Sequence, residues 1–378
     1  MQFRDLKTQY QILKPQINEA IQGILNEGKF IMGRQVKELE EYLAEYVGVR
    51  YCLTCANGTD ALTMVLMAWN VKAGDAVFVP DFTFFATGEV VSLVGATPVF
   101  VDVDTDTFNI DPIKLEIVIK EIIKTGQLKP KAIIPVDLFG LPANYPEIEK
   151  IARKYNLLIL EDGAQGFGGM LNGQRACSFG HAATTSFFPA KPLGCYGDGG
   201  AVFTNDGELA EKLKSIRIHG KGSSRYDNVG IGMNSRLDTI QAAILQVKFQ
   251  AFIDYELEKV NQIARSYSEK LKDIVKTPII PKGYYSSWAQ YTIQLDNKKQ
   301  RDTLQEKLNE QGIPTMIYYP KPMHQQSAFA GVYSIFDDLS VAEDLCDKVL
   351  SLPIHPYLEE DSIMVICEAI AQIMEDIR

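Results

Sequence analysis

Short apolar runs separated by helical patterns dominate the first two-thirds of the chain. Apolar residues recur three and four positions apart from Arg34 to Gly48 and again within Tyr145–Tyr155, which predicts amphipathic helices. The runs between such helices lack polar alternation, which is typical of strands in a parallel sheet that is covered on both faces. They lie at Ala76–Val79, Pro98–Val103, Ala132–Val136, Leu157–Leu160, Thr184–Phe188 and Ala201–Thr204. Residues 1–236 are therefore expected to form a large α/β domain with a mostly parallel sheet and an N-terminal helix.

The pattern changes after residue 236. From Leu237 to about Ile274 helical residues continue without proline or glycine, which predicts a long helix over 237–275 that connects two domains. Residues 276–378 mix both kinds of element, which indicates a smaller α+β domain. The predicted elements there are an alternating strand at Gln290–Leu295, a helix at Gln300–Glu310, a second strand at Thr315–Tyr319 and a C-terminal helix from about Asp361.

Composition and charge narrow the class of protein. The 378 residues suit two domains, and 46% hydrophobic with 23% charged residues is the usual mix of a globular enzyme. The net charge of −10, without a basic stripe, gives no reason to expect a nucleic acid as partner. Arg4, Asp5 and Lys7 precede any apolar run, and nowhere do eighteen apolar residues follow one another. We therefore expect a cytoplasmic protein that does not bind a membrane.

The six cysteines are too few and too scattered for a disulfide framework. Cys52 and Cys55 form a single C-x-x-C, which could serve redox chemistry or zinc binding. No second pair accompanies them, and their segment, YCLTCANG, has the pattern of a buried strand end. Core packing is therefore the favoured interpretation, and no metal site is predicted.

The first candidate for chemistry is Lys191, in the segment TTSFFPAKPLGCYGDGG. A lysine is usually a solvated surface group. This one follows an apolar strand and is flanked by Pro189, Pro192 and a glycine-rich turn. A lysine that forms a Schiff base must be held uncharged beside an aldehyde carbon, and a rigid turn at the end of a core strand suits that need.

The second candidate is Asp162, where the run Leu157–Leu160 ends in the sequence EDGAQ. Carboxylates at the carboxyl ends of strands lie in the crevice where open α/β sheets bind ligands. Asp162 could simply cap a helix. Alternatively, it could keep the pyridine nitrogen of pyridoxal phosphate protonated, which makes the ring an electron sink.

The third candidate is a turn, Ala56-Asn57-Gly58-Thr59-Asp60, that opens directly onto a helical pattern at Ala61–Trp69. Backbone amides at a helix start can bind an anion without a lysine, and glycine permits close approach. This turn therefore suits a phosphate group, although many helices begin with such residues merely as a cap.

These segments occur in a characteristic order: strand, Asn-Gly-Thr, helix, then PDFTF, EDGAQ, SFFPAK and MNSRLDTIQAAIL. In that order and spacing, over the whole chain, the sequence resembles the DegT-type nucleotide-sugar aminotransferases. The resemblance implies a fold-type I aminotransferase with pyridoxal 5'-phosphate as cofactor. It also implies a homodimer whose active sites are shared between the two subunits.

The resemblance also assigns roles to the cofactor residues. Lys191 would bond the cofactor aldehyde, Asp162 would partner the pyridine nitrogen and Gln165 would lie near the ring hydroxyl. Phe84 would stack on the ring face, although a core phenylalanine is the alternative for an apolar run. The phosphate would be held by Gly58, Thr59 and Ser186, and by Asn234 from the neighbouring subunit. For Ser186 the alternative is an ordinary strand serine.

Four further residues match the positions at which the family meets its substrate. Arg236 would reach the substrate across the interface, and a helix-cap salt bridge is the alternative. Tyr318, Tyr319 and His324 lie in YYPKPMHQQ, which is similar to the family's segment that closes over the substrate. Many relatives have histidine where this chain has Tyr318, so the resemblance does not assign the hydrogen bonding to the sugar at this position.

The individual residues of the segments SFFPAKPLGCYGDGGAVFTND and SLPIHPYL are most similar to those of one branch of the family. That branch aminates the 3-position of UDP-2-acetamido-2-deoxy-3-oxo-glucuronate, with L-glutamate as donor and 2-oxoglutarate as product, for surface polysaccharides such as lipopolysaccharide O-antigen. Enzymes that aminate 4-keto nucleotide sugars share the cofactor residues and stay an alternative. A pyridoxal-dependent sugar dehydratase would replace the lysine, and a regulatory relative without turnover would lose the lysine or the acid.

Overall fold

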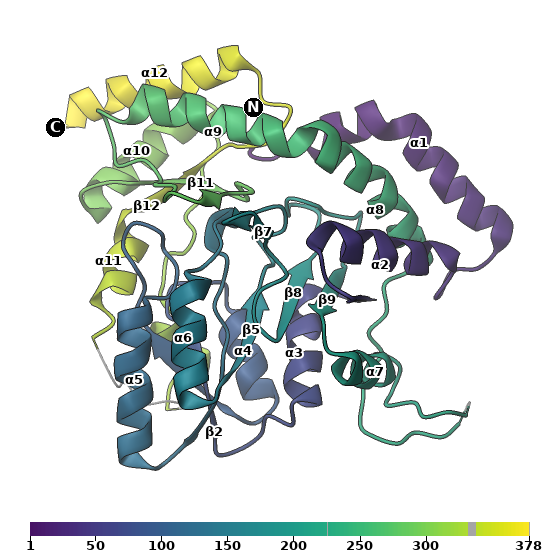
Figure 1. Ribbon diagram of the computed structural model, residues 1–378. Helices are drawn as coiled ribbons and strands as arrows, with labels where there is room; N and C mark the ends of the chain where they lie inside the picture. The colour runs from purple at the N-terminus through teal and green to yellow at the C-terminus, as the bar shows by residue number, and fades with distance from the viewer. Residues whose placement is uncertain (225, 332–337, 378) are drawn as a thin grey trace.

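A seven-stranded sheet forms the centre of the computed structural model, which describes residues 1–224, 226–331 and 338–377 (Figure 1). The order of the strands is β1-β9-β8-β5-β4-β2-β3, and each of the six predicted runs overlaps one of them. Neighbours from β8 to β3 are parallel, whereas β9 is antiparallel to both β8 and β1. The strands are β1 (Tyr51–Cys55), β2 (Asp75–Pro80), β3 (Thr97–Val101), β4 (Lys129–Ile133), β5 (Leu158–Asp162), β8 (Ala182–Ser186) and β9 (Gly200–Thr204).

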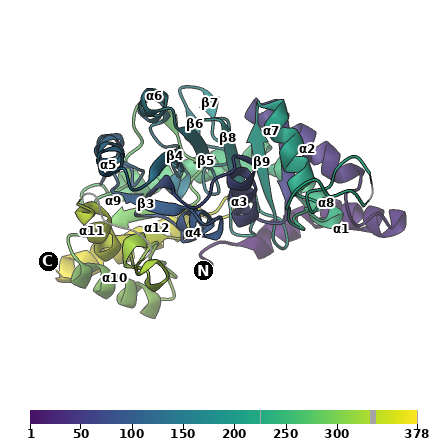
Figure 2. The same ribbon diagram turned by 90° about the horizontal axis from the view of Figure 1, so that it is seen from below.

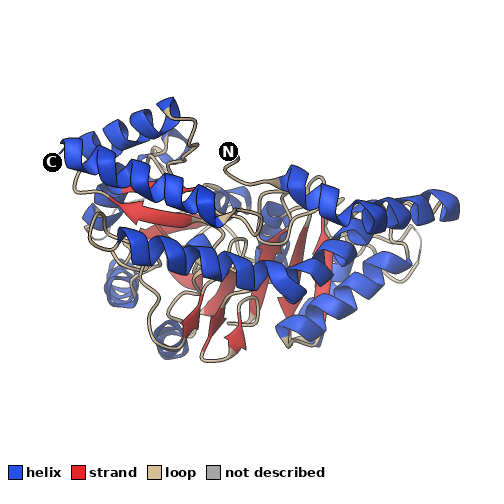
Figure 3. Ribbon diagram, turned by 90° about the horizontal axis from the view of Figure 1, so that it is seen from above, coloured by secondary structure: helices blue, strands red, loops and turns tan. Residues whose placement is uncertain are grey.

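Helices cover both faces of this sheet, as the mostly apolar strands require. On one face Val77 and Val79 pack into the cluster of buried residues that α3, α4 and α7 complete, and on the other face Ala76 and Phe78 pack with α5 and α6. The remaining part of that second face is covered by α2 and α8. The bounds are α2 (Arg34–Val47), α3 (Gly58–Ala68), α4 (Ala86–Leu93), α5 (Pro112–Thr125), α6 (Tyr145–Tyr155), α7 (Gly207–Ile216) and α8 (Thr239–Ala251). Figure 3 shows the strands enclosed in this way.

The predicted long helix is present, with an irregularity. Helix α8 continues through a turn of π-helix, Phe252–Glu256, into α9 (Leu257–Leu271). π-Helical turns are uncommon inside α-helices and often occur at functional sites. Helix α1 (Leu6–Glu27) packs along α8. None of the described helices is long and apolar enough to cross a membrane.

The C-terminal part of the chain builds a second apolar core. Here α9, α10 (Lys298–Glu310) and α12 (Glu360–Ile377) pack on a two-stranded antiparallel sheet of β11 (Tyr291–Gln294) and β12 (Val349–Leu352). Helix α11 (Ser340–Lys348) leads into β12. Three short strands, β6 (Met170–Leu171), β7 (Gln174–Arg175) and β10 (Tyr284–Tyr285), form a third sheet. The domain limits at residues 236 and 275 stay a prediction.

The prediction of a strand at Thr315–Tyr319 is wrong. Only Met316 pairs there, in an isolated bridge with Ser351. The segment lies between Pro314 and Pro320. Tyr319 packs against the rings of Phe82 and Phe84, which follow β2, so its side chain is not available to a sheet face. The partner of β11 is instead β12. This strand has four residues and directly follows α11, and the spacing of apolar residues does not show where the helix ends and the strand begins.

Candidate active site

The topology brings the three candidates from the sequence, namely Lys191, Asp162 and the turn after β1, to one edge of the sheet. Strands β5 and β8 are parallel, so Asp162 and Ser186, the last residues of these strands, lie at the same edge. Strand β1 is antiparallel to β9, as β8 is, so β1 also runs toward this edge, where the turn Asn57-Gly58 follows it. Ligands of open α/β sheets bind at the carboxyl ends of the strands, near such a change in strand order.

Lys191 lies in a tight turn just beyond β8. Its backbone N–H donates to the carbonyl of Phe188 at 2.9 Å. A Cβ at Gly194 would lie 2.5 Å from that same carbonyl oxygen, so the turn can close only with glycine there. Burial lowers the pKa of Lys191 to about 8, the Asp162 carboxylate opposes this shift, and the nearby Arg4 guanidinium adds to it. About a tenth of the amine is therefore neutral and nucleophilic at pH 7, far more than for an exposed lysine.

Asp162 is buried and held in one orientation. It accepts hydrogen bonds from Thr87 Oγ1 at 2.9 Å and from the N–H of Ala164 at 3.2 Å. Burial raises its pKa, while the Thr87 and Ala164 hydrogen bonds and the Lys191 charge act in the opposite direction. A turn follows Asp162, and the next described helix is α7, so the helix-cap interpretation does not apply. The carboxylate is thus directed into the site, where a cationic ring nitrogen would compensate its buried charge.

The start of α3 and the end of β8 form a cradle for an anion. Asn57 caps the helix, and its side chain accepts from the N–H of Asp60 at 2.7 Å. Gly58 approaches Ser186 so closely that a Cβ on the glycine would lie 2.9 Å from the serine Cβ. Thr59 follows within the first turn of the helix, and Ser186 Oγ is bonded to the N–H of Phe188 at 3.2 Å. Backbone amides at a helix start, a hydroxyl group and a glycine that permits close approach together suit a phosphate group.

Gln165, Phe84 and Tyr319 form one wall of the site. Gln165 donates from Nε2 to the Tyr319 hydroxyl at 3.0 Å and accepts the N–H of Phe139 on Oε1 at 2.7 Å. The Phe84 ring lies 6.3 Å from the Tyr319 ring and is 54% exposed, so the alternative of a core phenylalanine does not hold. An exposed phenyl face beside a polar site is suited to stack on a planar ring.

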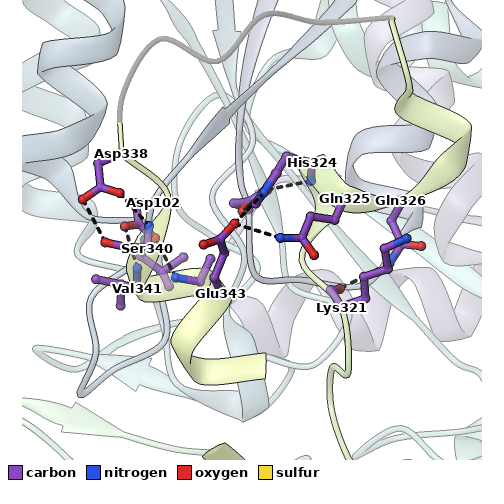
Figure 4. A network of polar contacts seen from close by, with 12 residues as sticks. Asp102, Lys321, His324, Gln325, Gln326, Asp338, Ser340, Val341 and Glu343 are labelled. Carbon is purple, nitrogen blue, oxygen red and sulfur yellow. Dashed lines mark hydrogen bonds and ion pairs between the residues drawn. The ribbon is translucent and has the colours of Figure 1, made fainter. Parts of the chain in front are cut away.

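His324 is held in a network of carboxylates (Figure 4). Its N–H donates to Asp81 Oδ1 at 2.8 Å, its Nδ1 lies 2.6 Å from Asp81 Oδ2, and its Nε2 lies 3.2 Å from Glu343 Oε1. The Asp81 hydrogen bond is the main cause of a raised pKa of His324. Both ring nitrogens are thus engaged within the chain. The structure fixes His324 as a link between β2 and α11, and its contact with substrate stays a prediction.

Asn234 and Arg236 form no hydrogen bond or ion pair with these groups in the part of the chain that the structure describes. Between them Ser235 is buried and accepts the N–H of Ala56 on its hydroxyl at 3.1 Å. Asn234 on one side of Ser235 is exposed, and Arg236 on the other side is partly exposed. Arg236 lines an open cavity with His219 and other residues, and it forms no ion pair with a described residue, so the helix-cap salt bridge is not formed.

Two residues of this region were missed by the sequence analysis. Thr87 orients Asp162 and lies three residues after Phe84 in PDFTFFAT, so the segment itself carried the signal. Arg4 donates to the carbonyl of Lys191, and no local pattern could reveal a contact across 187 positions. The C-x-x-C cysteines, Cys52 and Cys55, are both buried, in agreement with the core interpretation.

An aldehyde, a pyridine nitrogen and a phosphate are the groups by which pyridoxal 5'-phosphate is held, and the sheet edge presents a partner for each. The chain is a pyridoxal-phosphate-dependent aminotransferase of fold type I. Comparison with family models then gives its family: residues 11–371 match the DegT/DnrJ/EryC1/StrS aminotransferase family, to which this chain belongs.

Individual relatives agree with this assignment. The chain is 45% identical to the UDP-2-acetamido-2-deoxy-3-oxo-D-glucuronate aminotransferase of Pseudomonas aeruginosa over 98% of this chain and 99% of the relative. It is 44% identical to a pleiotropic regulatory protein of Geobacillus stearothermophilus over 97% of each chain. The crystal structure of a DegT DnrJ EryC1 StrS aminotransferase from Brucella abortus superimposes with a TM-score of 0.96, at 52% identity and 99% coverage of both chains.

Proposed function

We propose that this enzyme transfers the amino group of L-glutamate to the 3-position of a UDP-linked 3-oxo uronate sugar, in a cytoplasmic step toward a surface polysaccharide. The observation that carries the proposal is the complete set of Lys191, Asp162 and the α3 anion cradle in a chain that is similar over its whole length to the Pseudomonas aeruginosa enzyme. Amination of a 4-keto nucleotide sugar is the alternative, because it would need the same three groups.

The chain's own residues account for the proton movements. When bound, pyridoxal phosphate supplies an electron sink for the carbon that loses a proton. Lys191 Nζ is the base that removes this proton from the α-carbon of glutamate, and it later delivers a proton to the sugar carbon that receives the amino group. Its lowered pKa, about 8, suits both directions near neutral pH. Asp162 holds a proton at the pyridine nitrogen.

The test is a substrate panel with a matched variant. Purified enzyme and glutamate are offered a UDP-linked 3-oxo uronate, the neutral 3-oxo sugar and a 4-keto nucleotide sugar, and release of 2-oxoglutarate is measured. Turnover should be fastest with the uronate. An ion pair to a desolvated carboxylate is worth about 2 kcal/mol or more, so Arg236→Ala should raise KM about thirtyfold for the uronate and far less for the neutral sugar. Equal penalties would remove Arg236 from carboxylate recognition.

We further propose a homodimer in which Asn234 and Arg236 complete the active site of the partner subunit. The exposure of Asn234 and the partial exposure of Arg236, on either side of the buried Ser235, support this arrangement, because both side chains are accessible to a second subunit.

Subunit mixing tests the shared site. Heterodimers of a Lys191→Ala subunit and an Arg236→Ala subunit, isolated with two affinity tags, should regain about half of the wild-type activity, although each parent homodimer is impaired. One site then lacks both residues and the other is intact. If both residues serve the same chain's site, every site carries one defect, and activity measured below KM does not rise above that of the Arg236→Ala parent. A heterodimer of Lys191→Ala with wild type provides the reference for one intact site.

A regulatory role without turnover is the second candidate, because the Geobacillus stearothermophilus relative is named as a regulatory protein. The panel separates the two functions. A protein that binds the cofactor and aminates none of the keto sugars would favour regulation. The presence of both Lys191 and Asp162 supports turnover, since a purely regulatory protein needs neither group for binding alone.

A further inference from the structure

The N-terminal arm, residues 1–5, lies against the active site. The Phe3 ring meets the Tyr318 ring edge-on at 6.3 Å, and Arg4 Nη2 donates to the carbonyls of Lys191 at 2.8 Å and Pro192 at 3.5 Å. Asp5 then caps α1 by accepting the N–H of Thr8 at 2.8 Å. Figure 2 shows the N-terminus between the helices of the C-terminal part and those of α1, α2 and α8. The arm thus connects the turn that carries Lys191 to Tyr318 and to the start of α1.

The buried carboxylate of Glu256 acts electrostatically on Arg4 in this arm. Glu256, 3% exposed, ends the π-helical turn between α8 and α9. It accepts hydrogen bonds from Gln9 Nε2 at 2.8 Å and from the Tyr357 hydroxyl, and Tyr357 lies 3.1 Å from the Tyr255 hydroxyl. A buried anion of this kind is costly unless cations offset it. Both neutral donors bind its Oε1, so they leave its charge uncompensated, and that charge acts on the cations around it.

Two cations face Glu256, and they are placed differently. Lys248 is 1% exposed and its ammonium lies over the Tyr196 ring at 4.9 Å. Arg4 instead bonds the Lys191 turn directly. The Glu256 carboxylate opposes the lowering of the pKa of both Arg4 and Lys248, which burial causes. Glu256 therefore helps to keep the Arg4 guanidinium charged in its half-buried position.

We propose that Arg4 is a positioning residue for Lys191: its guanidinium fixes the backbone turn that carries the lysine and sets a cation near the lysine amine. The inference rests on the proposed role of Lys191. Fixing the carbonyl restricts the backbone of a residue whose amine must reach one carbon atom, and such positioning is a large part of catalysis.

The charges around the amine define the expected direction of the effect. Asp162 from β5 and Arg4 from the arm are the charged groups that act on Lys191, with opposite signs. Glu256 and Tyr357 in turn oppose the lowering of the pKa of Arg4, and the Arg4 charge helps to lower the pKa of His355. Without the Arg4 cation the attraction of Asp162 for a proton on the amine is unopposed. The amine then holds its proton to a higher pH.

The experiment compares Arg4→Gln with Arg4→Lys, which keeps the charge but loses the planar fork, and with Lys7→Gln, which removes an exposed cation nearby. The readout is the pH midpoint of the visible absorbance of purified holoenzyme. We expect a rise of about one unit in Arg4→Gln, a smaller rise in Arg4→Lys and none in Lys7→Gln. If Arg4→Gln does not fold, Arg4→Met, which keeps the apolar stem, takes its place with the same expectation.

A second readout uses the protein without cofactor. The rate at which an acylating reagent modifies Lys191, followed by peptide mass spectrometry across pH, should show the same ordering of variants. An unchanged midpoint in Arg4→Gln, or an equal shift in Lys7→Gln, overturns the inference. Borohydride reduction of the wild-type holoenzyme separates this failure from that of the proposed function. Cofactor on Lys191 with an unchanged midpoint overturns only the role of Arg4, whereas cofactor on another lysine overturns the proposed function as well.

Discussion

Lys191→Ala is expected to abolish transamination, with a loss of at least about ten-thousandfold, and to leave the fold intact. The side chain supplies both the bond to the cofactor aldehyde and the base for proton transfer, and no other lysine lies beside Asp162 in the described chain. The turn itself is held by main-chain groups, the N–H to Phe188 and the carbonyl to Arg4, so thermal unfolding should shift by only a few degrees.

Borohydride reduction followed by peptide mapping checks the assignment. The control is Lys248→Ala, because burial lowers the pKa of Lys248 to about 8, as it does for Lys191, although Lys248 lies in α8 beside the Tyr196 ring. Reduced cofactor should remain on Lys191 in the Lys248→Ala variant and be lost in Lys191→Ala. The opposite pattern would show that a lowered pKa, and not the place at the sheet edge, had selected the lysine.

The features that the sequence could predict are those that depend on local pattern and sheet direction. Buried strands followed by turn residues placed Lys191, Asp162 and the Asn57-Gly58 turn each at a strand end, and strands that run in one direction bring their ends to one edge. The mostly parallel α/β fold is confirmed for the same reason. The assignments that came only from family resemblance, such as Asn234 and Arg236, stay predictions because they concern a second subunit.

The rest depended on contacts between distant segments. Arg4 reaches the Lys191 turn only because α1 packs along α8, and His324 reaches Asp81 only after the C-terminal part folds onto β2. Neither contact produces a periodic pattern of apolar residues in the sequence. The strand expected at Thr315–Tyr319 failed for a related reason, since the apolar and aromatic residues there include Tyr319, which packs on the aromatic rings of the site.

Asp162→Asn should retain the cofactor but lose about a thousandfold or more in rate, because an amide cannot stabilise the proton on the pyridine nitrogen. The phosphate cradle and the backbone turn of Lys191 are held without the carboxylate, so binding is expected to weaken much less than the rate. Cofactor affinity and single-turnover rate must therefore be measured separately, since a variant that only loses the cofactor would imitate the result.

Thr87→Val provides a graded comparison for Asp162→Asn. It removes the 2.9 Å hydrogen bond that orients Asp162 but keeps the negative charge, at nearly the same side-chain volume. We expect a loss of about tenfold, which corresponds to one hydrogen bond to a charged group. If charge is what matters, the two variants differ by about two orders of magnitude in rate at saturating cofactor. A loss of only a few-fold in Asp162→Asn would mean that the buried carboxylate serves the fold of the EDGAQ turn and that another group holds the nitrogen proton.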